Sequence, residues 1–240
     1  MAVEGALGSD RSRGAVARAG SAAKGRARVA IVAIAPAVIL AGSALHPFIG
    51  LGPPDDARIA RAVVSQPTLW GFAHLLIGVG SGLVALAFLA IRSHLRDEGD
   101  ERLSPLGLAA IVFSSSLYAF LPGVEFAALA AAKIGADVRS AQAAIQPWFV
   151  PAILMGGLTF ALGATRFARA ISVVGIGSSR QTRFVVGALM VAGISRLFPL
   201  TGAQLYLHAA ALVAALWPLS FAIAKRSAMR RPSYASVNTW

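Results

Sequence analysis

The sequence predicts an all-α integral membrane protein, built as a bundle of about six transmembrane helices, and three observations predict it. Hydrophobic residues make up 57% of the 240 residues and charged residues only 13%, whereas charged residues are about a quarter of a typical soluble domain. The hydrophobic residues gather in stretches close to the ~20 residues that a helix needs to cross a bilayer. Lysine and arginine gather in the short segments between those stretches. We therefore expect a multi-pass protein that is embedded in a lipid bilayer.

Six apolar stretches define the expected spans. They are residues 29–48, 70–91, 105–125, 148–168, 184–200 and 203–224. The fifth is the shortest, and the tight join FPLTGAQ (198–204) predicts that the last two spans form a helical hairpin. Residues 1–28 are rich in Gly, Ala, Ser and Arg and are predicted to form a disordered basic tail. Residues 29–224 form the expected transmembrane domain, and residues 225–240 form a second basic tail.

The distribution of positive charge predicts the orientation, because Lys and Arg are retained on the cytoplasmic side of a membrane. With six crossings, the four segments on the side of the N-terminus hold 17 of the 22 Lys and Arg residues. Both termini are therefore predicted to be cytoplasmic, in a protein of the cell membrane. An alternative treats the first stretch as a cleaved signal peptide, since the small residues AGSA precede Leu45. Cleavage would leave five spans and an external N-terminus.

Composition and missing motifs exclude several functions. The net charge of +12 is typical of nucleic-acid binding when basic residues cluster on one surface. Here they lie at the ends of hydrophobic stretches, so we expect no nucleic-acid partner. The chain has no cysteine, which excludes disulfides, thiolate metal ligands and cysteine nucleophiles. It also lacks a Walker-type glycine loop, a G-x-S-x-G elbow and an H-E-x-x-H pair, the motifs of ATP-driven transport, ordinary hydrolases and zincins.

Ionisable residues inside spans are the candidate functional residues, because each needs a partner or a cavity at membrane depth. Threading the six spans places five of them, one from each of five spans, at similar depth near the outer face. They are His46, His74, Glu125, Arg196 and His208. This shared depth predicts a pocket of His, Glu and Arg side chains in the outer leaflet.

Local spacing supports the pocket but leaves alternatives open. Ser114, Tyr118 and Glu125 share one helical face, unless the helix ends at Pro122 and Glu125 becomes a loop carboxylate. The histidines could instead be simple anchors at the membrane interface. Arg196 could reach the lipid headgroups, or form a purely structural ion pair with Glu125.

The first functional hypothesis is a cofactor or metal site. His74 with His208 or His46 would supply two axial nitrogen ligands to a haem. The three histidines together with Glu125 would suit a divalent metal such as zinc or copper, or non-haem iron. Either group would support redox or Lewis-acid chemistry.

Two further classes remain open. One is a membrane-embedded enzyme that acts on a lipid or prenyl substrate, of the terpene-cyclase or isomerase type. In that hypothesis Glu125 is the general acid, a histidine is the base and Arg196 binds an anionic group of the lipid-soluble molecule. The other class is non-catalytic: a transporter, an immunity protein or a regulatory membrane protein.

Overall fold

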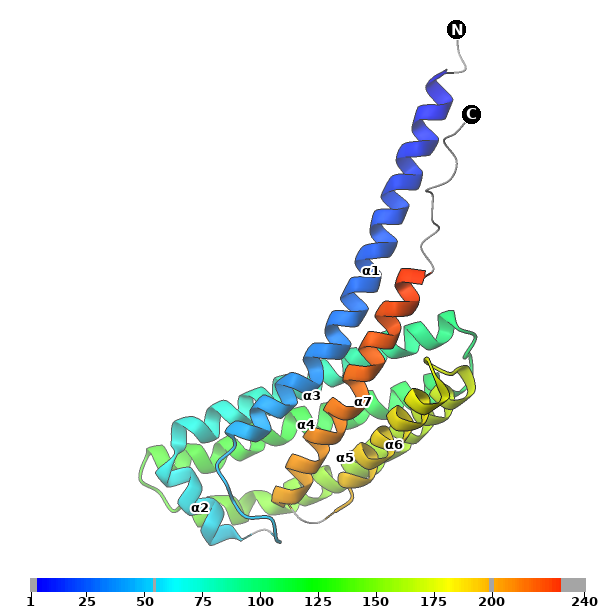
Figure 1. Cartoon of the computed structure of the whole chain (residues 1–240). Helices are drawn as coiled ribbons and strands as arrows, with labels where there is room; N and C mark the ends of the chain where they lie inside the picture. The colour runs from blue at the N-terminus through cyan, green and yellow to red at the C-terminus, as the bar shows by residue number, and fades with distance from the viewer. Residues whose placement is uncertain (1–3, 54, 199–200, 230–240) are drawn as a thin grey trace.

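The computed structural model describes residues 4–53, 55–198 and 201–229, and these residues form helices joined by short loops (Figure 1). The helices are α1 (Glu4–Leu45), α2 (Asp56–Ser65), α3 (Pro67–Asp97), α4 (Leu103–Lys133), α5 (Val138–Val174), α6 (Ser179–Ser195) and α7 (Thr201–Met229). The described residues contain no strand, which agrees with the predicted all-α fold.

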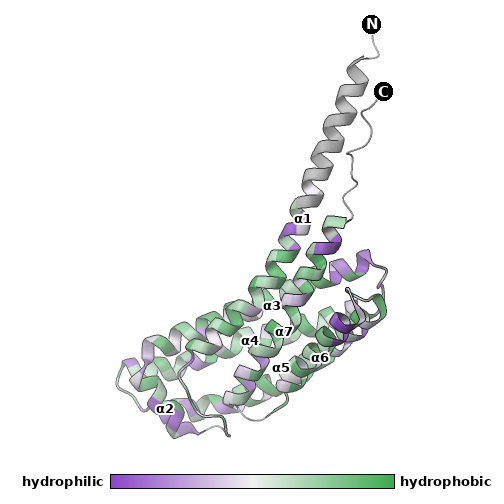
Figure 2. Cartoon of the chain, in the orientation of Figure 1, coloured by the Kyte–Doolittle hydropathy of each residue, from purple (hydrophilic) through white to green (hydrophobic). Residues whose placement is uncertain are grey.

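Five helices are long and apolar enough to cross a membrane, so the architecture is that of a multi-pass helical membrane protein. These segments are Ala23–Leu45, Pro67–Asp97, Leu103–Lys133, Val138–Val174 and Gly202–Arg226. The fifth predicted span lies on α6, which has 17 residues and so falls short of the ~20 that a perpendicular crossing needs. Figure 2 shows hydrophobic residues along the bundle and hydrophilic residues at α2 and near the helix ends.

Six of the helices form a closed ring in chain order. Each of α1, α3, α4, α5, α6 and α7 packs mainly against two neighbours, and α7 returns to pack against α1. Glycines allow close contact between neighbouring helices. A Cβ added to Gly80 would lie 2.7 Å from Cδ1 of Ile39, and one added to Gly163 would lie 2.7 Å from Cγ1 of Ile111.

Two apolar clusters fill the ring at different levels. The larger one packs residues of α1, α3, α4, α5, α6 and α7, and it includes Phe88, whose ring centroid lies 4.8 Å from that of Phe167. The smaller one joins α2 to α3, α4 and the start of α5, around Val63 and Trp70. Along α4 the larger cluster includes Ile111 and the smaller one begins at Ala128. The interior between these two levels holds the candidate site.

The helix α2 was not predicted from the sequence. Asp55 begins it by accepting hydrogen bonds from the backbone N–H groups of Ala57 and Arg58, at 3.0 and 3.2 Å. Its buried face, which includes Ile59 and Val63, packs against α3, α4 and α5. This amphipathic helix therefore covers one end of the ring, which we call the α2 end.

The segment predicted as a disordered tail, residues 1–28, is helical from Glu4 onward. Its alanines and arginines are strong helix formers, and they extend a helix that the following apolar segment has already nucleated. The start of α1 and the end of α7 project from the same end of the bundle, opposite α2 (Figure 1). The second predicted tail, residues 225–240, is helical to Met229, and the remainder lies outside the described residues.

Candidate functional site

A cavity of about 350 Å³ lies inside the ring, between the two apolar clusters and near the α2 end. All six helices of the ring, or the loop residues directly after them, contribute to its lining. Most of the lining side chains are apolar, such as Ile77, Leu121 and Leu205. The cavity is therefore an apolar chamber with a small number of polar groups, which is typical of small-molecule sites.

Four of the five predicted site residues line this cavity: His46, His74, Glu125 and Arg196. The fifth, His208, is buried behind the cavity wall, with its Nδ1 atom 3.0 Å from the backbone oxygen of Ala192. The structure thus brings together side chains from α3, α4 and the ends of α1 and α6.

Arg196 occupies one end of the cavity, directly after the last residue of α6. Its guanidinium carbon lies 3.7 Å from the centroid of the Tyr118 ring, a cation–π contact. The side-chain amide of Gln204 donates to the backbone oxygen of Arg196 at 2.8 Å. Among the described residues, Nε of Arg196 has no hydrogen-bond partner and no carboxylate lies within ion-pair distance of the side chain. The cation is therefore held by an aromatic ring and has no counter-charge there.

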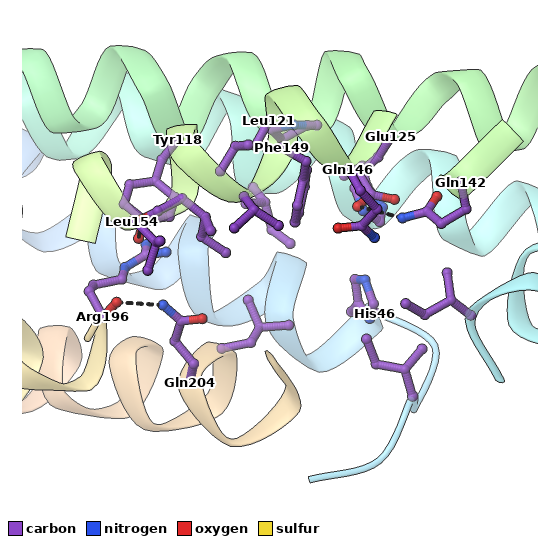
Figure 3. A pocket seen from close by; sticks show the side chains of 18 of the residues that line it. His46, Tyr118, Leu121, Glu125, Gln142, Gln146, Phe149, Leu154, Arg196 and Gln204 are labelled. Carbon is purple, nitrogen blue, oxygen red and sulfur yellow. Dashed lines mark hydrogen bonds between the residues drawn. The ribbon is translucent and has the colours of Figure 1, made fainter. Parts of the chain in front are cut away.

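Glu125 lies at the other end of the cavity, beside Gln142, Gln146 and His46 (Figure 3). The helix α4 continues through Pro122 to Lys133, so the alternative that Glu125 is a loop residue is wrong. Its Oε1 atom accepts a long hydrogen bond of 3.4 Å from the side-chain amide of Gln142. Its Oε2 atom and the Oε1 atom of Gln142 are buried without a hydrogen-bond partner in the described part of the chain. The alternative of an ion pair between Glu125 and Arg196 is also wrong, because the two residues lie at opposite ends of the cavity (Figure 3).

His46 and His74 share a common tautomer. Nδ1 of His46 lies 2.8 Å from the backbone oxygen of Pro47, and Nδ1 of His74 lies 2.8 Å from that of Trp70. A carbonyl oxygen only accepts, so each Nδ1 carries the hydrogen, and Nε2 of the neutral ring is left as an acceptor. Both histidines line the cavity, and in the neutral form each ring offers Nε2 as an acceptor.

The structure does not support the predicted metal cluster, nor a haem held between His46 and His74. No three His, Asp or Glu side chains of the described residues gather closely enough to hold a metal ion. The rings of His46 and His74 have centroids only 4.9 Å apart, so they contact each other. Two axial ligands on opposite faces of a haem iron, each with a metal–nitrogen bond of about 2 Å, would lie farther apart than this. His208, the third predicted ligand, bonds to the backbone of α6 instead.

Part of the cavity lining reaches the surface of the bundle. Four apolar lining residues there are substantially exposed: Val150 (43%), Leu154 (58%), Leu197 (47%) and Phe198 (47%). They belong to α5 and to the segment after α6. An opening with an apolar rim gives access to hydrocarbon and is unfavourable for water-soluble molecules.

Sequence analysis missed two polar lining residues, Gln142 and Gln146. Hydropathy places the start of the fourth span at residue 148, whereas α5 begins at Val138. The sequence pattern that could have indicated them is their spacing of four residues. This spacing puts two amides on one helical face directly before Pro147 and Pro151. A hydropathy window does not detect this amphipathic first part of α5.

Fold and site thus define an all-helical protein that has five helices able to cross a membrane and an amphipathic cavity near one end. Comparison of the chain with protein-family models, curated proteins and solved structures finds no match. The cavity is therefore the basis of the functional proposal.

The contact between Tyr118 and Arg196 should contribute measurably to stability. Replacing Tyr118→Leu removes the ring beneath the guanidinium and a 3.2 Å hydrogen bond to the backbone oxygen of Ile153. We expect the free energy of unfolding in detergent to fall by about 1 kcal/mol or more. Tyr118→Phe keeps the ring and should lose less. In an Arg196→Gln background, the difference in the free energy of unfolding between Tyr118→Leu and Tyr118→Phe should become smaller. An unchanged difference would show that the cation–π contact does not contribute to stability.

Proposed function

We propose that this chain is a multi-pass protein of the cell membrane that binds an anionic, lipid-soluble molecule, with Arg196 holding the anion. The observation that carries the proposal is the state of Arg196. It borders an apolar cavity and has no carboxylate within ion-pair distance among the described residues. A cation in apolar surroundings is costly unless it is paired. A carboxylate or phosphate group on a ligand would complete this site.

The walls and the opening support a lipid-soluble ligand. Between Arg196 and Glu125 the lining includes Leu121 and Phe149 (Figure 3), which favour a hydrocarbon chain. The exposed rim at Leu154 and Phe198 supports entry from the bilayer. A volume of about 350 Å³ lies at the lower end of the range for small-molecule pockets, about 300 to 1,000 Å³.

Fluorescence of Trp70, which lies in the cavity wall, provides the test. In a protein that keeps Trp70 as its single tryptophan, brominated dodecanoate should quench the emission saturably, since bromine quenches on contact. Arg196→Gln should weaken this binding by about tenfold or more, because a charge-assisted hydrogen bond is lost. The neutral analogue, brominated dodecanol, should bind weakly and with the same affinity to the parent and to Arg196→Gln.

The matched control is Arg139→Gln, which removes an exposed cation from the start of α5, outside the cavity lining. This variant should bind brominated dodecanoate as the parent does. Equal affinity of the parent and Arg196→Gln for the anion would contradict the proposal, as would binding that does not saturate.

We also propose six crossings with both termini in the cytoplasm, α6 being the short crossing. In support, α6 takes a full place in the ring between α5 and α7. The start of α1 and the end of α7 share one end of the bundle (Figure 1). At that end Arg28 pairs with Asp97 at 2.7 Å and Arg226 pairs with Glu98 at 3.3 Å. An even number of crossings and the positive-inside distribution account for this arrangement together.

Topology can be measured directly because the chain has no cysteine. A membrane-impermeant maleimide applied to intact cells should label Arg139→Cys, at the α2 end. Lys24→Cys and Lys225→Cys should be labelled only after the membrane is opened. Labelling of Lys225→Cys on intact cells, with Lys24→Cys protected, would show an odd number of crossings and exclude α6 as a span.

A second candidate function is acid–base catalysis on such a lipid, of the isomerase or terpene-cyclase type. It is favoured by Oε2 of Glu125, which has no hydrogen-bond partner among the described residues, and by the imidazoles of His46 and His74, which line the same cavity. The carboxyl would give its proton to one carbon of a double bond, and an imidazole would take a proton from the saturated carbon next to the other carbon of that double bond. The imidazolium would then return a proton to the carboxylate. The double bond shifts, and no oxidant or co-substrate is consumed.

Deuterium labelling tests this second candidate. Membranes that contain the protein, incubated in heavy water, should yield a lipid with deuterium on carbon. Glu125→Gln should abolish this incorporation while it leaves the binding of brominated dodecanoate within a few-fold. Equal incorporation in membranes with the variant and the parent would exclude Glu125 as the acid.

A further inference from the structure

The cavity has unsatisfied polar groups at both ends, separated by apolar walls. At one end is Nε of Arg196. At the other are Oε2 of Glu125 and Oε1 of Gln142, which are buried without a hydrogen-bond partner in the described part of the chain. His46 and His74 also line the cavity, and their Nδ1 atoms bond to backbone oxygens. Buried polar groups without partners are costly, so both ends call for a ligand group. The anion at Arg196 accounts for only one of them.

Two residues of α4 give the distance between the two ends of the cavity. Tyr118, which lies against Arg196, and Glu125 both line the cavity, and they are seven residues apart on one helix. At a rise of 1.5 Å per residue this separation is about 10 Å. Leu121 lies between them on α4, and Phe149 faces the same stretch from α5 (Figure 3). A ligand that reaches both ends therefore needs an extended hydrocarbon spacer.

The polar atoms at the Glu125 end of the cavity indicate which second polar group the ligand carries. Carboxylate and amide oxygens accept hydrogen bonds, as do the Nε2 atoms of neutral imidazoles. The side-chain amide of Gln142 is already used as a donor to Glu125. A ligand carbonyl could accept from Gln146 but would leave the acceptor atoms of Glu125, Gln142 and His46 without a donor, and a second anion would be repelled by an ionised Glu125. A hydroxyl group can donate to these acceptors and still accept from Gln146.

We infer that the ligand of this cavity is a hydroxylated anionic lipid, with its anion at Arg196 and its hydroxyl about 10 Å away, among Glu125, Gln142 and His46. This inference rests on the proposed anion site at Arg196 and names the ligand class for it. The chain then selects among anionic lipids by the position of a hydroxyl group along the hydrocarbon.

The test is competition with brominated dodecanoate for the protein in which Trp70 is the single tryptophan. It compares decanoate with ω-hydroxydecanoate, which has one additional oxygen atom. We expect ω-hydroxydecanoate to displace the probe at about a tenfold lower concentration than decanoate, the worth of one well-placed hydrogen bond. The shorter ω-hydroxyhexanoate, which cannot reach from Arg196 to Glu125, should show no advantage over hexanoate.

Variants at the two ends localise the effect. Gln142→Leu, and separately Glu125→Gln, should reduce the advantage of the hydroxyl to about twofold while binding of decanoate is kept. Gln204→Leu, beside Arg196, is the matched control and should change both affinities by the same factor, so that their ratio is unchanged.

The outcomes separate the two proposals. If decanoate binds in an Arg196-dependent manner but the hydroxyl brings no advantage, the anion site stands and the hydroxylated ligand is excluded. An advantage that survives both Gln142→Leu and Glu125→Gln would also overturn the inference, because the hydroxyl would then bind elsewhere. If decanoate does not bind, or binds independently of Arg196, the proposed function itself fails.

Discussion

The contact between α1 and α7 closes the ring of helices, and the enclosed cavity depends on that closure. Away from the cavity the two helices are joined by a hydrogen bond of 3.0 Å from the indole N–H of Trp217 to the backbone oxygen of Ala33. Near the α2 end, the segment after α1 packs so closely on the start of α7 that a Cβ at Gly202 would overlap the backbone of Gly50. Gly50 has a φ of 95°, which other residues rarely adopt. Glycine is therefore required on both sides of this contact.

Inside the closed ring, the close-packed apolar side chains and the polar side chains of the cavity lie at different levels along the helices. The larger cluster around Phe88 is filled by close-packed side chains and provides a rigid base for the six helices. At the level of the cavity, α4 contains Pro122 and α5 contains Pro147 and Pro151. Each proline removes one backbone hydrogen bond and favours a bend. Two of the helices that border the cavity, α4 and α5, thus have interrupted backbone bonding at its level.

The polar groups of the cavity are costly for stability, which is typical of functional sites. The cost of burying Arg196 is partly offset by its contact with the ring of Tyr118. The cost of burying Glu125 is partly offset by a long hydrogen bond from Gln142. Elsewhere in the ring, two buried serines bond to backbone oxygens: Ser43 to that of Ile39 and Ser114 to that of Gly156. The fold can therefore satisfy buried polar groups, and it leaves several of those around the cavity unsatisfied. A bound ligand is the simplest source of their missing partners.

The sequence by itself determined the helical class, the approximate positions of the spans and the depth of the ionisable residues. These properties depend on hydropathy and charge along one chain segment at a time, so His46, His74, Glu125 and Arg196 could be named before any contact was known. Only the tertiary structure decided the order of the helices around the ring, because the apolar surface of a membrane helix does not indicate which neighbour it faces. The helix α2 and the two glutamines of α5 were missed because amphipathic segments fall below the hydropathy of a span. The predicted metal cluster found no support for the same physical reason: similar depth does not set the distances between side chains on different helices. Packing bonded His208 to the backbone of α6 and placed Arg196 and Glu125 at opposite ends of one cavity.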